Sequence, residues 1–309
     1  MLLAAPPPGA WRPRPISEPD LQIRSASVQE VEQAWSGFAA PAWSGFIDGS
    51  SFVVERGVTG DHRFVHGAQP DRNGALAPQT RAIHHLCADA AVLRCAPIDR
   101  SDPSWWRVVL DSVLFTVALL RGHEALHAGA FTTGRGAIAL TAASEGGKST
   151  LLAELLGRGH TLVADDVLVL ESQRDGSPLA HPAPPLMTVA SKGIPRLGEG
   201  AERTICSLGE ESWIAVPVCP EPLPLRALVV LDRGPGSGHA GARPSLNRIK
   251  NPLAPLLDSL MSFPITPERE QARFELASAL ACGSGVWRLA ADPKTPPSVL
   301  ADVLLEGEL

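Results

Sequence analysis

The fold of this chain is decided by the stretch Ala142-Ala143-Ser144-Glu145-Gly146-Gly147-Lys148-Ser149-Thr150. An apolar run at 137–140 precedes it, and a run typical of a helix, 151–156, follows it. A strand, a glycine-containing turn that ends in Lys-Ser, and a helix form the context of a phosphate-binding loop. Backbone N–H groups of such a loop surround phosphate oxygens, and the helix adds the positive end of its dipole. The alternative is an accidental turn of this composition. The flanking strand and helix favour a site for a nucleoside triphosphate.

Two side chains of the loop have chemical roles in this interpretation. Lys148 would reach the β- and γ-phosphates, and the Ser149 hydroxyl would be a ligand of Mg²⁺. Ala142 stands where the usual loop has its first glycine, which is a mild change where φ is negative. Glu145 adds a negative charge near the triphosphate, so we expect weaker binding unless its side chain points outward.

A pair of carboxylates, Asp165 and Asp166, lies between two apolar runs, 160–164 and 167–170. Enzymes with a phosphate-binding loop place a Mg²⁺ ligand at the carboxyl end of a buried strand. Successive residues of an extended chain point in opposite directions, so one carboxylate could bind the metal and the other could act as a general base. The alternative is an ordinary polar strand end, where Asp is common.

A histidine, His127, lies upstream at the start of the apolar run 126–131 and is a candidate to face the γ-phosphate. A structural role is the alternative for a single histidine. Four segments now share an order and a spacing that resemble the catalytic domain of HPr kinase/phosphorylase and its kinase relatives. They are Leu126-His127-Ala128-Gly129, Gly136-Ala137-Ile138-Ala139-Leu140, Ser144 to Thr150, and Arg158 to Asp166.

The resemblance implies an α/β fold, in which a P-loop kinase domain has a mixed, twisted sheet. It also implies ATP and Mg²⁺ as cofactors. His127, Lys148, Asp165 and Asp166 would be catalytic, with one Asp acting as base toward a serine hydroxyl. Ser149 and Asp166 would bind the metal, and residues 142–150 the nucleotide. The sequence leaves open which Asp is the base, and whether ATP or GTP is preferred.

The downstream signature of that family is not recognisable, and 191–195, Ser-Lys-Gly-Ile-Pro, is a poor match to it. That segment serves the phosphorylase reaction and the HPr partner in the family. We therefore expect a divergent relative with another acceptor. The missing segment argues against the reverse reaction, but the sequence leaves that reaction open. It resembles the kinases that modify ribosomal peptides, including the lasso-peptide kinases that phosphorylate a serine.

Composition narrows the class of protein. With 309 residues, 44% of them hydrophobic, the chain is long enough for one large or two modest domains with a real core. A net charge of −6 argues against a nucleic-acid or membrane-surface partner. Five scattered cysteines, none in a CxxC pair, predict reduced thiols. The N-terminus lacks a positive leader and a long apolar core, so we expect a cytoplasmic protein without a secretion signal.

Two domains are predicted, with a boundary near residue 100. Residues 1–100 would form an accessory or substrate-binding module, small α/β or mostly β, with a disordered proline-rich start and strands at 51–54 and 91–94. A short repeat in this module, at 34–38 and 42–46, is better explained by two apolar anchors that pack a loop than by a peptide-binding surface.

Residues 101–309 would form the kinase domain, which begins with a helix after Asp102-Pro103. No regular structure is expected at 178–185. A strand is expected at 225–233, followed by helices near 253–261, 267–280 and 298–306 and a strand at 286–289.

The sequence therefore predicts a Mg·ATP-dependent kinase that phosphorylates a hydroxyl, most readily a serine of a peptide or small protein. Two other functions stay open, a kinase of a small hydroxylated metabolite and a non-catalytic, nucleotide-gated binding module. The relatives often form oligomers, which favours a homo-oligomer. A basic cluster at Arg243, Arg248 and Lys250 would either stabilise the transferred phosphoryl group or be a solvated face.

Overall fold

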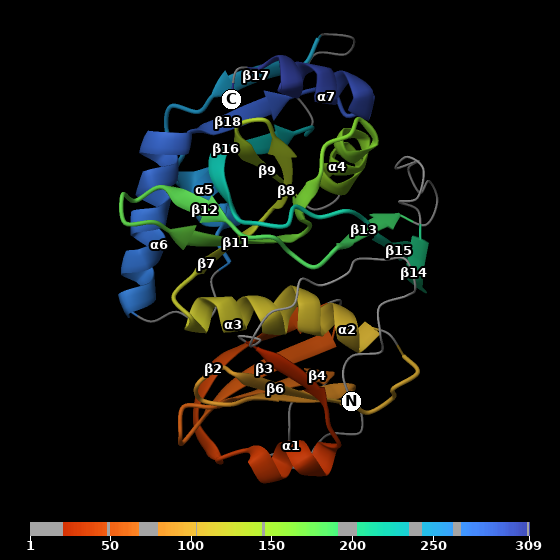
Figure 1. Cartoon of the computed structure of the whole chain (residues 1–309), viewed down its shortest axis with the longest axis vertical. Coiled ribbons are helices and arrows are strands. Elements are labelled where there is room, and N and C mark those ends of the chain that lie inside the picture. The colour runs from red at the N-terminus through yellow and green to blue at the C-terminus, as the bar shows by residue number, and fades with distance from the viewer. Residues whose placement is uncertain are drawn as a thin grey trace. The chain divides into compact units, whose positions relative to one another are not determined.

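The computed structural model describes residues 21–47, 50–67, 80–102, 104–143, 146–190, 203–234, 243–261, 267–307 and 309. The chain has mixed α/β structure, as the sequence predicts, and divides into two compact units (Figure 1). The N-terminal unit is Met1–Arg121, and the C-terminal unit is Gly122–Leu309. Ser144, Glu145, the proline-rich start and the segment 191–195 lie outside the described residues.

The described part of the N-terminal unit contains a six-stranded sheet in the order β1-β6-β5-β4-β3-β2. Its strands are β1 (Gln22–Ser25), β2 (Phe38–Ile47), β3 (Ser50–Gly57), β4 (His62–Gly67), β5 (Ala82–Leu86) and β6 (Val92–Pro97). β1 is parallel to β6, and the other pairs are antiparallel. Helix α1 (Val28–Ala34) begins with a capping box between Ser27 and Glu30 and packs Val31 against Val65 and Ile83 of the sheet. The two predicted strands correspond to β3 and β6.

A helical segment after the sheet comprises α2 (Ser104–Val108), a π-helical turn (Val109–Val113) and α3 (Leu114–Leu120). The Trp105 ring stacks on His84 of β5, with 6.3 Å between ring centroids, and Arg121 donates a hydrogen bond to the Ala90 carbonyl. These contacts group the segment with the N-terminal unit, whereas the sequence prediction places it at the start of the second domain. Within this unit the sheet lies between α1 and the helical segment (Figure 1).

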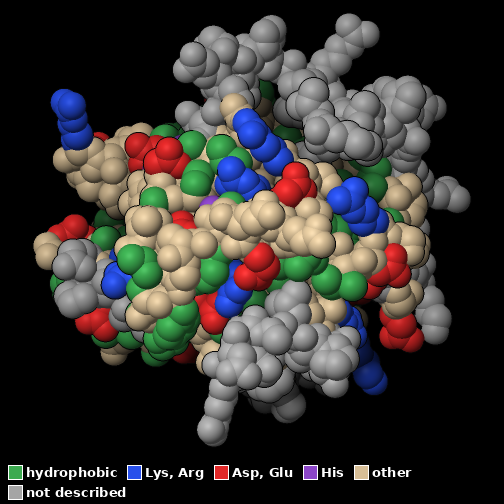
Figure 2. Space-filling view, turned by 90° about the horizontal axis from the view of Figure 1, so that it is seen from below, with side chains coloured by type: hydrophobic (Ala, Val, Ile, Leu, Met, Phe, Trp, Pro, Cys, Tyr) green, Lys and Arg blue, Asp and Glu red, His purple; other side chains and the backbone are tan. Residues whose placement is uncertain are grey.

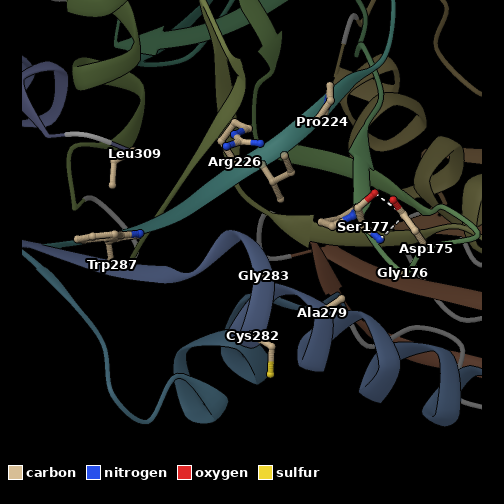
Figure 3. Close-up of a pocket in the computed structure, with 12 residues that line it drawn as sticks. Asp175, Gly176, Ser177, Pro224, Arg226, Ala279, Cys282, Gly283, Trp287 and Leu309 are labelled. Carbon is tan, nitrogen blue, oxygen red and sulfur yellow. Dashed lines mark hydrogen bonds between the residues drawn. The ribbon is translucent and has the colours of Figure 1, made fainter.

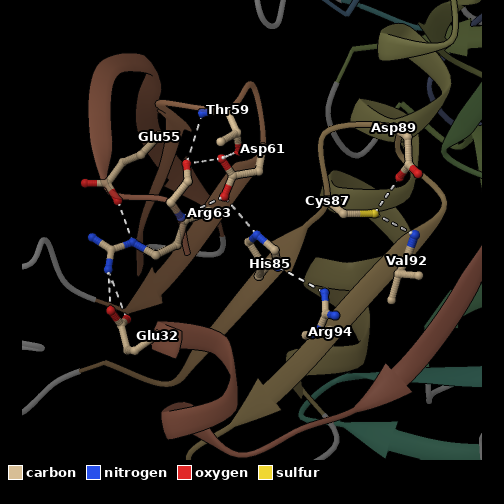
Figure 4. Close-up of polar contacts among 11 residues, drawn as sticks. Glu32, Glu55, Thr59, Asp61, Arg63, His85, Cys87, Asp89, Val92 and Arg94 are labelled. Carbon is tan, nitrogen blue, oxygen red and sulfur yellow. Dashed lines mark hydrogen bonds and ion pairs between the residues drawn. The ribbon is translucent and has the colours of Figure 1, made fainter. Parts of the chain in front are cut away.

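A buried polar network supports the loops of the N-terminal unit (Figure 4). Asp61 accepts hydrogen bonds from the Ser36 and Thr59 hydroxyls and contacts Nε2 of His85 at 2.9 Å. Arg63 bridges Glu32 and Glu55, and its guanidinium lies 5.0 Å from the Trp35 ring centroid. In the second copy of the repeat, the Trp43 ring lies 6.1 Å from that of Phe52. Both tryptophans of the repeat thus pack within their own unit.

The described part of the C-terminal unit contains a nine-stranded mixed sheet, in which β16 is parallel to both β9 and β18. Seven strands follow the order β10-β8-β9-β16-β12-β11-β7, and β18 pairs with β16 and β17. The strands are β7 (Glu124–His127), β8 (Gly129–Thr133), β9 (Gly136–Ala142), β10 (Leu162–Ala164), β11 (Val167–Ser172), β12 (Pro178–Ala180), β16 (Leu223–Asp232), β17 (Ser245–Arg248) and β18 (Val286–Ala290).

Helices cover both faces of this sheet because its central strands are apolar on both sides. Along β9, Ile138 and Leu140 face a core shared with α4 (Lys148–Gly157) and α7 (Pro297–Glu306). The alternate residues Ala137 and Ala139 face a second core. That core is shared with α5 (Leu253–Ser259), α6 (Pro267–Ala279) and a following π-helical turn (Leu280–Ser284). The predicted strand before residues 142–150 and the predicted helix after them are confirmed. The strands and helices predicted after residue 224 are confirmed as well.

One prediction about the middle of the chain is incomplete, and one sheet in this region was not predicted. Residues 178–185 are not wholly irregular, because β12 pairs with β11 and β16, and Pro178 is tolerated as its first residue. A small antiparallel sheet, unpredicted, also lies in the described part of this region. Its order is β13-β15-β14, with β13 (Leu186–Ala190), β14 (Arg203–Leu208) and β15 (Glu211–Ala215).

No helix in the described part of the chain is long and apolar enough to cross a membrane. Its five cysteines are all free thiols. On the face shown in Figure 2, acidic and basic side chains are interspersed among polar and apolar ones.

Candidate functional site

The turn between β9 and α4 has the backbone geometry of a tight, glycine-dependent loop at its described end. The Gly146 N–H donates to the Ala143 carbonyl at 2.9 Å. Gly147 caps α4 with a φ of +89°, a left-handed conformation that side-chain-bearing residues rarely adopt. The helix then starts at Lys148, followed by the partly buried Ser149 and the exposed Thr150.

Lys148 connects the start of α4 to the two predicted carboxylates. Its side chain is only 9% exposed, and its Nζ forms an ion pair with Oδ1 of Asp166. The same Nζ lies 4.0 Å from Oδ1 of Asp165. The structure therefore brings Lys148 close to both aspartates, although Asp166 lies 18 positions further along the chain.

Strand pairing places the two aspartates beside Lys148. They form the connection between β10, which pairs with β8, and β11, which pairs with β7. Asp166 has a φ of +61°, unusual for a residue with a side chain, and its carbonyl accepts a hydrogen bond from Ala128 N–H at 3.2 Å. Backbone strain of this kind is found preferentially at functional sites.

The two carboxylates differ in their surroundings. The Asp165 side chain is 5% exposed, and its Oδ2 accepts a hydrogen bond from the Thr188 N–H at 2.8 Å. Its buried Oδ1 has no hydrogen-bond partner among the described residues. Burial and the neighbouring charge of Asp166 raise the pKa of Asp165, although Lys148 opposes the shift. The Asp166 side chain is 26% exposed and is therefore the more accessible of the two.

His127 belongs to the same electrostatic cluster. It is the last residue of β7 and pairs in register with Val167, directly after Asp166, rather than lying at the start of a strand as predicted. Its carbonyl accepts a hydrogen bond from the Thr141 hydroxyl of β9. The residue is exposed, yet atoms packed around its ring lower its pKa by partial removal of water. The charge of Lys148 lowers this pKa further, and Asp166 opposes both effects.

One basic residue near the turn was missed by the sequence interpretation. Arg233 follows β16, whose Leu231 pairs with Ala142 at the end of β9. A Cβ atom built on Gly147 would lie 2.7 Å from Nη1 of Arg233, so the guanidinium borders the turn. Its Nη2 donates to the carbonyl of Thr295 at 2.9 Å, which fixes its orientation. The signal available in the sequence was a basic residue at the carboxyl end of the strand predicted at 225–233.

The predicted basic cluster at 243–250 is a solvated surface. Arg243, Arg248 and Lys250 are exposed, and Arg243 forms an ion pair with the exposed Glu306. A pocket of about 610 Å³ elsewhere in the C-terminal unit is lined by residues that include Arg226, Cys282 and Trp287 (Figure 3). Lys148, Asp165 and Asp166 are not among the residues that line it.

Comparisons with known proteins give a distant likeness. No protein-family model matches the chain, and no curated protein matches it. Among solved structures, it is similar to the Hpr(Ser) kinase/phosphatase from Coxiella burnetii, with 14% identity and a TM-score of 0.35. The match covers 59% of this chain and 94% of that one.

Proposed function

We propose that this protein is a Mg·ATP-dependent kinase that transfers the γ-phosphate to a hydroxyl group, most readily a serine of a peptide or small protein. One observation carries the proposal. Lys148, at the start of a helix that follows a strand and a glycine turn, faces two adjacent carboxylates with a histidine in the same cluster. Phosphoryl transfer needs positioned positive charge and an acceptor for the hydroxyl proton, and these residue types supply both.

Lys148 has two alternative anionic partners in this mechanism. Without nucleotide its ammonium pairs with Asp166. With ATP bound, the ammonium contacts the β- and γ-phosphates, together with N–H groups of the turn and of the first turn of α4. This exchange of partners releases the Asp166 carboxylate at the moment when substrate is present.

Asp166 is the better candidate for the base because its carboxylate is partly exposed, whereas Asp165 is buried. It takes the proton of the acceptor hydroxyl as that oxygen forms a bond to the γ-phosphorus. The bond between the γ-phosphorus and the β–γ bridging oxygen breaks, and ADP leaves. His127 interacts electrostatically with this carboxylate and with Lys148, so its protonation state affects the charge around the transferred phosphate.

The residues fit a magnesium ion. The buried Oδ1 of Asp165 has no hydrogen-bond partner in the described structure, and a hard cation would satisfy this oxygen. We propose that Asp165 and the Ser149 hydroxyl hold Mg²⁺, which would neutralise charge on the phosphates. The family resemblance gave Asp166 as the metal ligand and left open which aspartate is the base. The exposure of the two side chains favours Asp165 for the metal and Asp166 for the base.

The test is mass spectrometry of candidate acceptors incubated with the protein and Mg·ATP, starting with serine-containing peptides. A gain of one phosphate that disappears with Lys148→Ala would support the proposal and identify the modified residue. If phosphate appears only on small hydroxylated metabolites, the acceptor class is wrong. If the protein binds nucleotide but transfers phosphate neither to an acceptor nor to water, the kinase proposal is wrong. The protein is then better described as a nucleotide-gated binding module.

A further inference from the structure

A second cluster of potential ligands lies at the opposite ends of two strands that border the candidate active site. It consists of His123, directly before β7, Glu171 of β11, and His181, directly after β12. One ligand atom from each residue lies within 4.8 Å of the others. This is the one such group of three or more His, Cys, Asp or Glu residues found among the described residues.

Strand register explains why these three side chains meet. β11 lies between β7 and β12, and Leu170 pairs with Glu124 on one side and Ala180 on the other. Leu170 and Ala180 point into the core beneath α5 and α6. Glu124 shares their face because it pairs with Leu170. His123, Glu171 and His181 directly adjoin Glu124, Leu170 and Ala180, so alternation along the chain directs the three side chains to the opposite face of the sheet.

The three candidate ligands are already close to one another. Nε2 of His181 lies 2.8 Å from Oε2 of Glu171. The rings of His123 and His181 lie 5.2 Å apart, tilted by 42°. The side chains of His181 and Glu171 are 29% and 44% exposed, so an ion and its water ligands can enter from solvent.

We propose that His123, Glu171 and His181 form a binding site for a divalent first-row transition ion of the Zn²⁺ type. Two imidazoles and one carboxylate suit Zn²⁺, and Mg²⁺ prefers an all-oxygen set. Metal–ligand bonds of about 2.0–2.2 Å place ligand atoms about 3.3–3.6 Å apart in a tetrahedral site. Ion binding would therefore separate Nε2 of His181 and Oε2 of Glu171 slightly, from 2.8 Å, and bring any atoms that lie up to 4.8 Å apart closer together by side-chain rotation. Water completes the fourth position, because the site is open on one side.

Binding at this site would stabilise the strand pair that carries part of the candidate active site. His123 and His127 are at the two ends of β7, roughly 13 Å apart along an extended strand. Glu171 is on β11, which begins directly after Asp166. An ion that ties His123 to β11 and β12 therefore fixes the first residues of the C-terminal unit to its sheet. This inference does not depend on the proposed kinase activity.

The experiment is calorimetric titration of the full chain with Zn²⁺, without nucleotide and with excess Mg²⁺ present. We expect one saturable Zn²⁺ site per chain, with affinity lowered by at least about 100-fold in His181→Ala and in Glu171→Gln, since even outer-shell changes at metal sites cost 10–100-fold. Asp175→Asn removes a nearby carboxylate from the turn between β11 and β12 and should leave the affinity unchanged. Circular dichroism of each metal-free variant shows that it is folded.

A second variant separates this site from the aspartate pair. Asp166→Asn should bind Zn²⁺ as the unchanged protein does. The proposal is overturned if the unchanged protein has no saturable Zn²⁺ site. It is equally overturned if Asp166→Asn abolishes binding while Glu171→Gln keeps it. Cobalt(II) serves as an independent probe, because its visible absorption should intensify in the unchanged protein and not in His181→Ala.

Discussion

At the scale of single residues, the important finding is that two adjacent aspartates have different environments. Asp165 is buried and held by the Thr188 backbone, whereas Asp166 is partly exposed and paired with Lys148. Because burial and the charge of Asp166 raise its pKa, Asp165 carries less negative charge near neutral pH until a cation approaches. A difference in environment of this kind separates the roles of paired carboxylates in many enzymes.

We predict that Asp165→Asn and Asp166→Asn impair phosphoryl transfer in different ways. Asp166→Asn should lower the rate of phosphoryl transfer by at least about 100-fold, because it removes the proton acceptor, while Mg·ATP still binds. Asp165→Asn should instead raise the Mg²⁺ concentration needed for half-maximal rate. Both are measured as initial rates over a Mg²⁺ titration. A normal rate in Asp166→Asn together with loss of transfer in Asp165→Asn would reverse the assigned roles.

At the scale of elements, the unit β9–turn–α4 depends on one left-handed glycine. The φ of +89° at Gly147 allows the helix to start with Lys148 pointing toward the aspartates. A Cβ atom at this position would lie 2.7 Å from Nη1 of Arg233, so the end of the arginine side chain would have to shift. The backbone conformation therefore favours glycine here, and the neighbouring guanidinium group adds to the cost of a side chain.

Gly147→Ala should lower the free energy of unfolding by about 1–2 kcal/mol, the usual cost of a left-handed conformation for a residue with Cβ. It should also weaken Mg·ATP binding, because Arg233 must move away from the turn. Urea unfolding and nucleotide titration measure the two effects. Gly134→Ala is the matched control, since a Cβ there meets open space, and we expect a change within about 0.5 kcal/mol. Equal effects of the two substitutions would contradict the requirement for glycine at 147.

Sequence patterns were informative where short-range signals and apolar runs agree. The strand at 137–140, the helix after Lys148 and the carboxylates between two strands follow from local periodicity and glycine placement. The position of Arg233 beside Gly147 does not, because it depends on the parallel pairing of β9 with β16, far apart in the chain. The same applies to the small sheet of β13, β14 and β15, whose pairing partners carry no strong local signal. The metal-ligand cluster likewise depends on register across three strands.

At the scale of the whole molecule, the N-terminal unit has its own acid-sensitive network. Burial raises the pKa of Asp61, but hydrogen bonds from Ser36, His85 and Thr59 outweigh this effect and lower it to about 2. The unfolded-state value is near 3.8. Because the folded pKa is the lower one, Asp61 contributes stability above pH 4, and this contribution is lost as pH falls toward 2.

We predict that the stability difference between the unchanged protein and Asp61→Asn shrinks by about 2 kcal/mol between pH 5 and pH 2, from 1.36 kcal/mol per pKa unit. Urea unfolding followed by tryptophan fluorescence reports it, since Trp35 lies against His85. Ser36→Ala should reduce the pH dependence, because it removes one hydrogen bond to the carboxylate. A difference that stays constant over this pH range would show that Asp61 is not held as a low-pKa carboxylate.

The central claim is that the cluster at Lys148 binds Mg·ATP, and isothermal titration of the whole chain with Mg·ATP tests it most directly. We predict one saturable site whose affinity falls by at least about 100-fold in Lys148→Ala, because a charge-assisted contact to two phosphates is lost. Lys250→Ala, on the exposed basic surface, should bind as the unchanged protein does. The absence of saturable binding, or equal binding by Lys148→Ala, would contradict the claim.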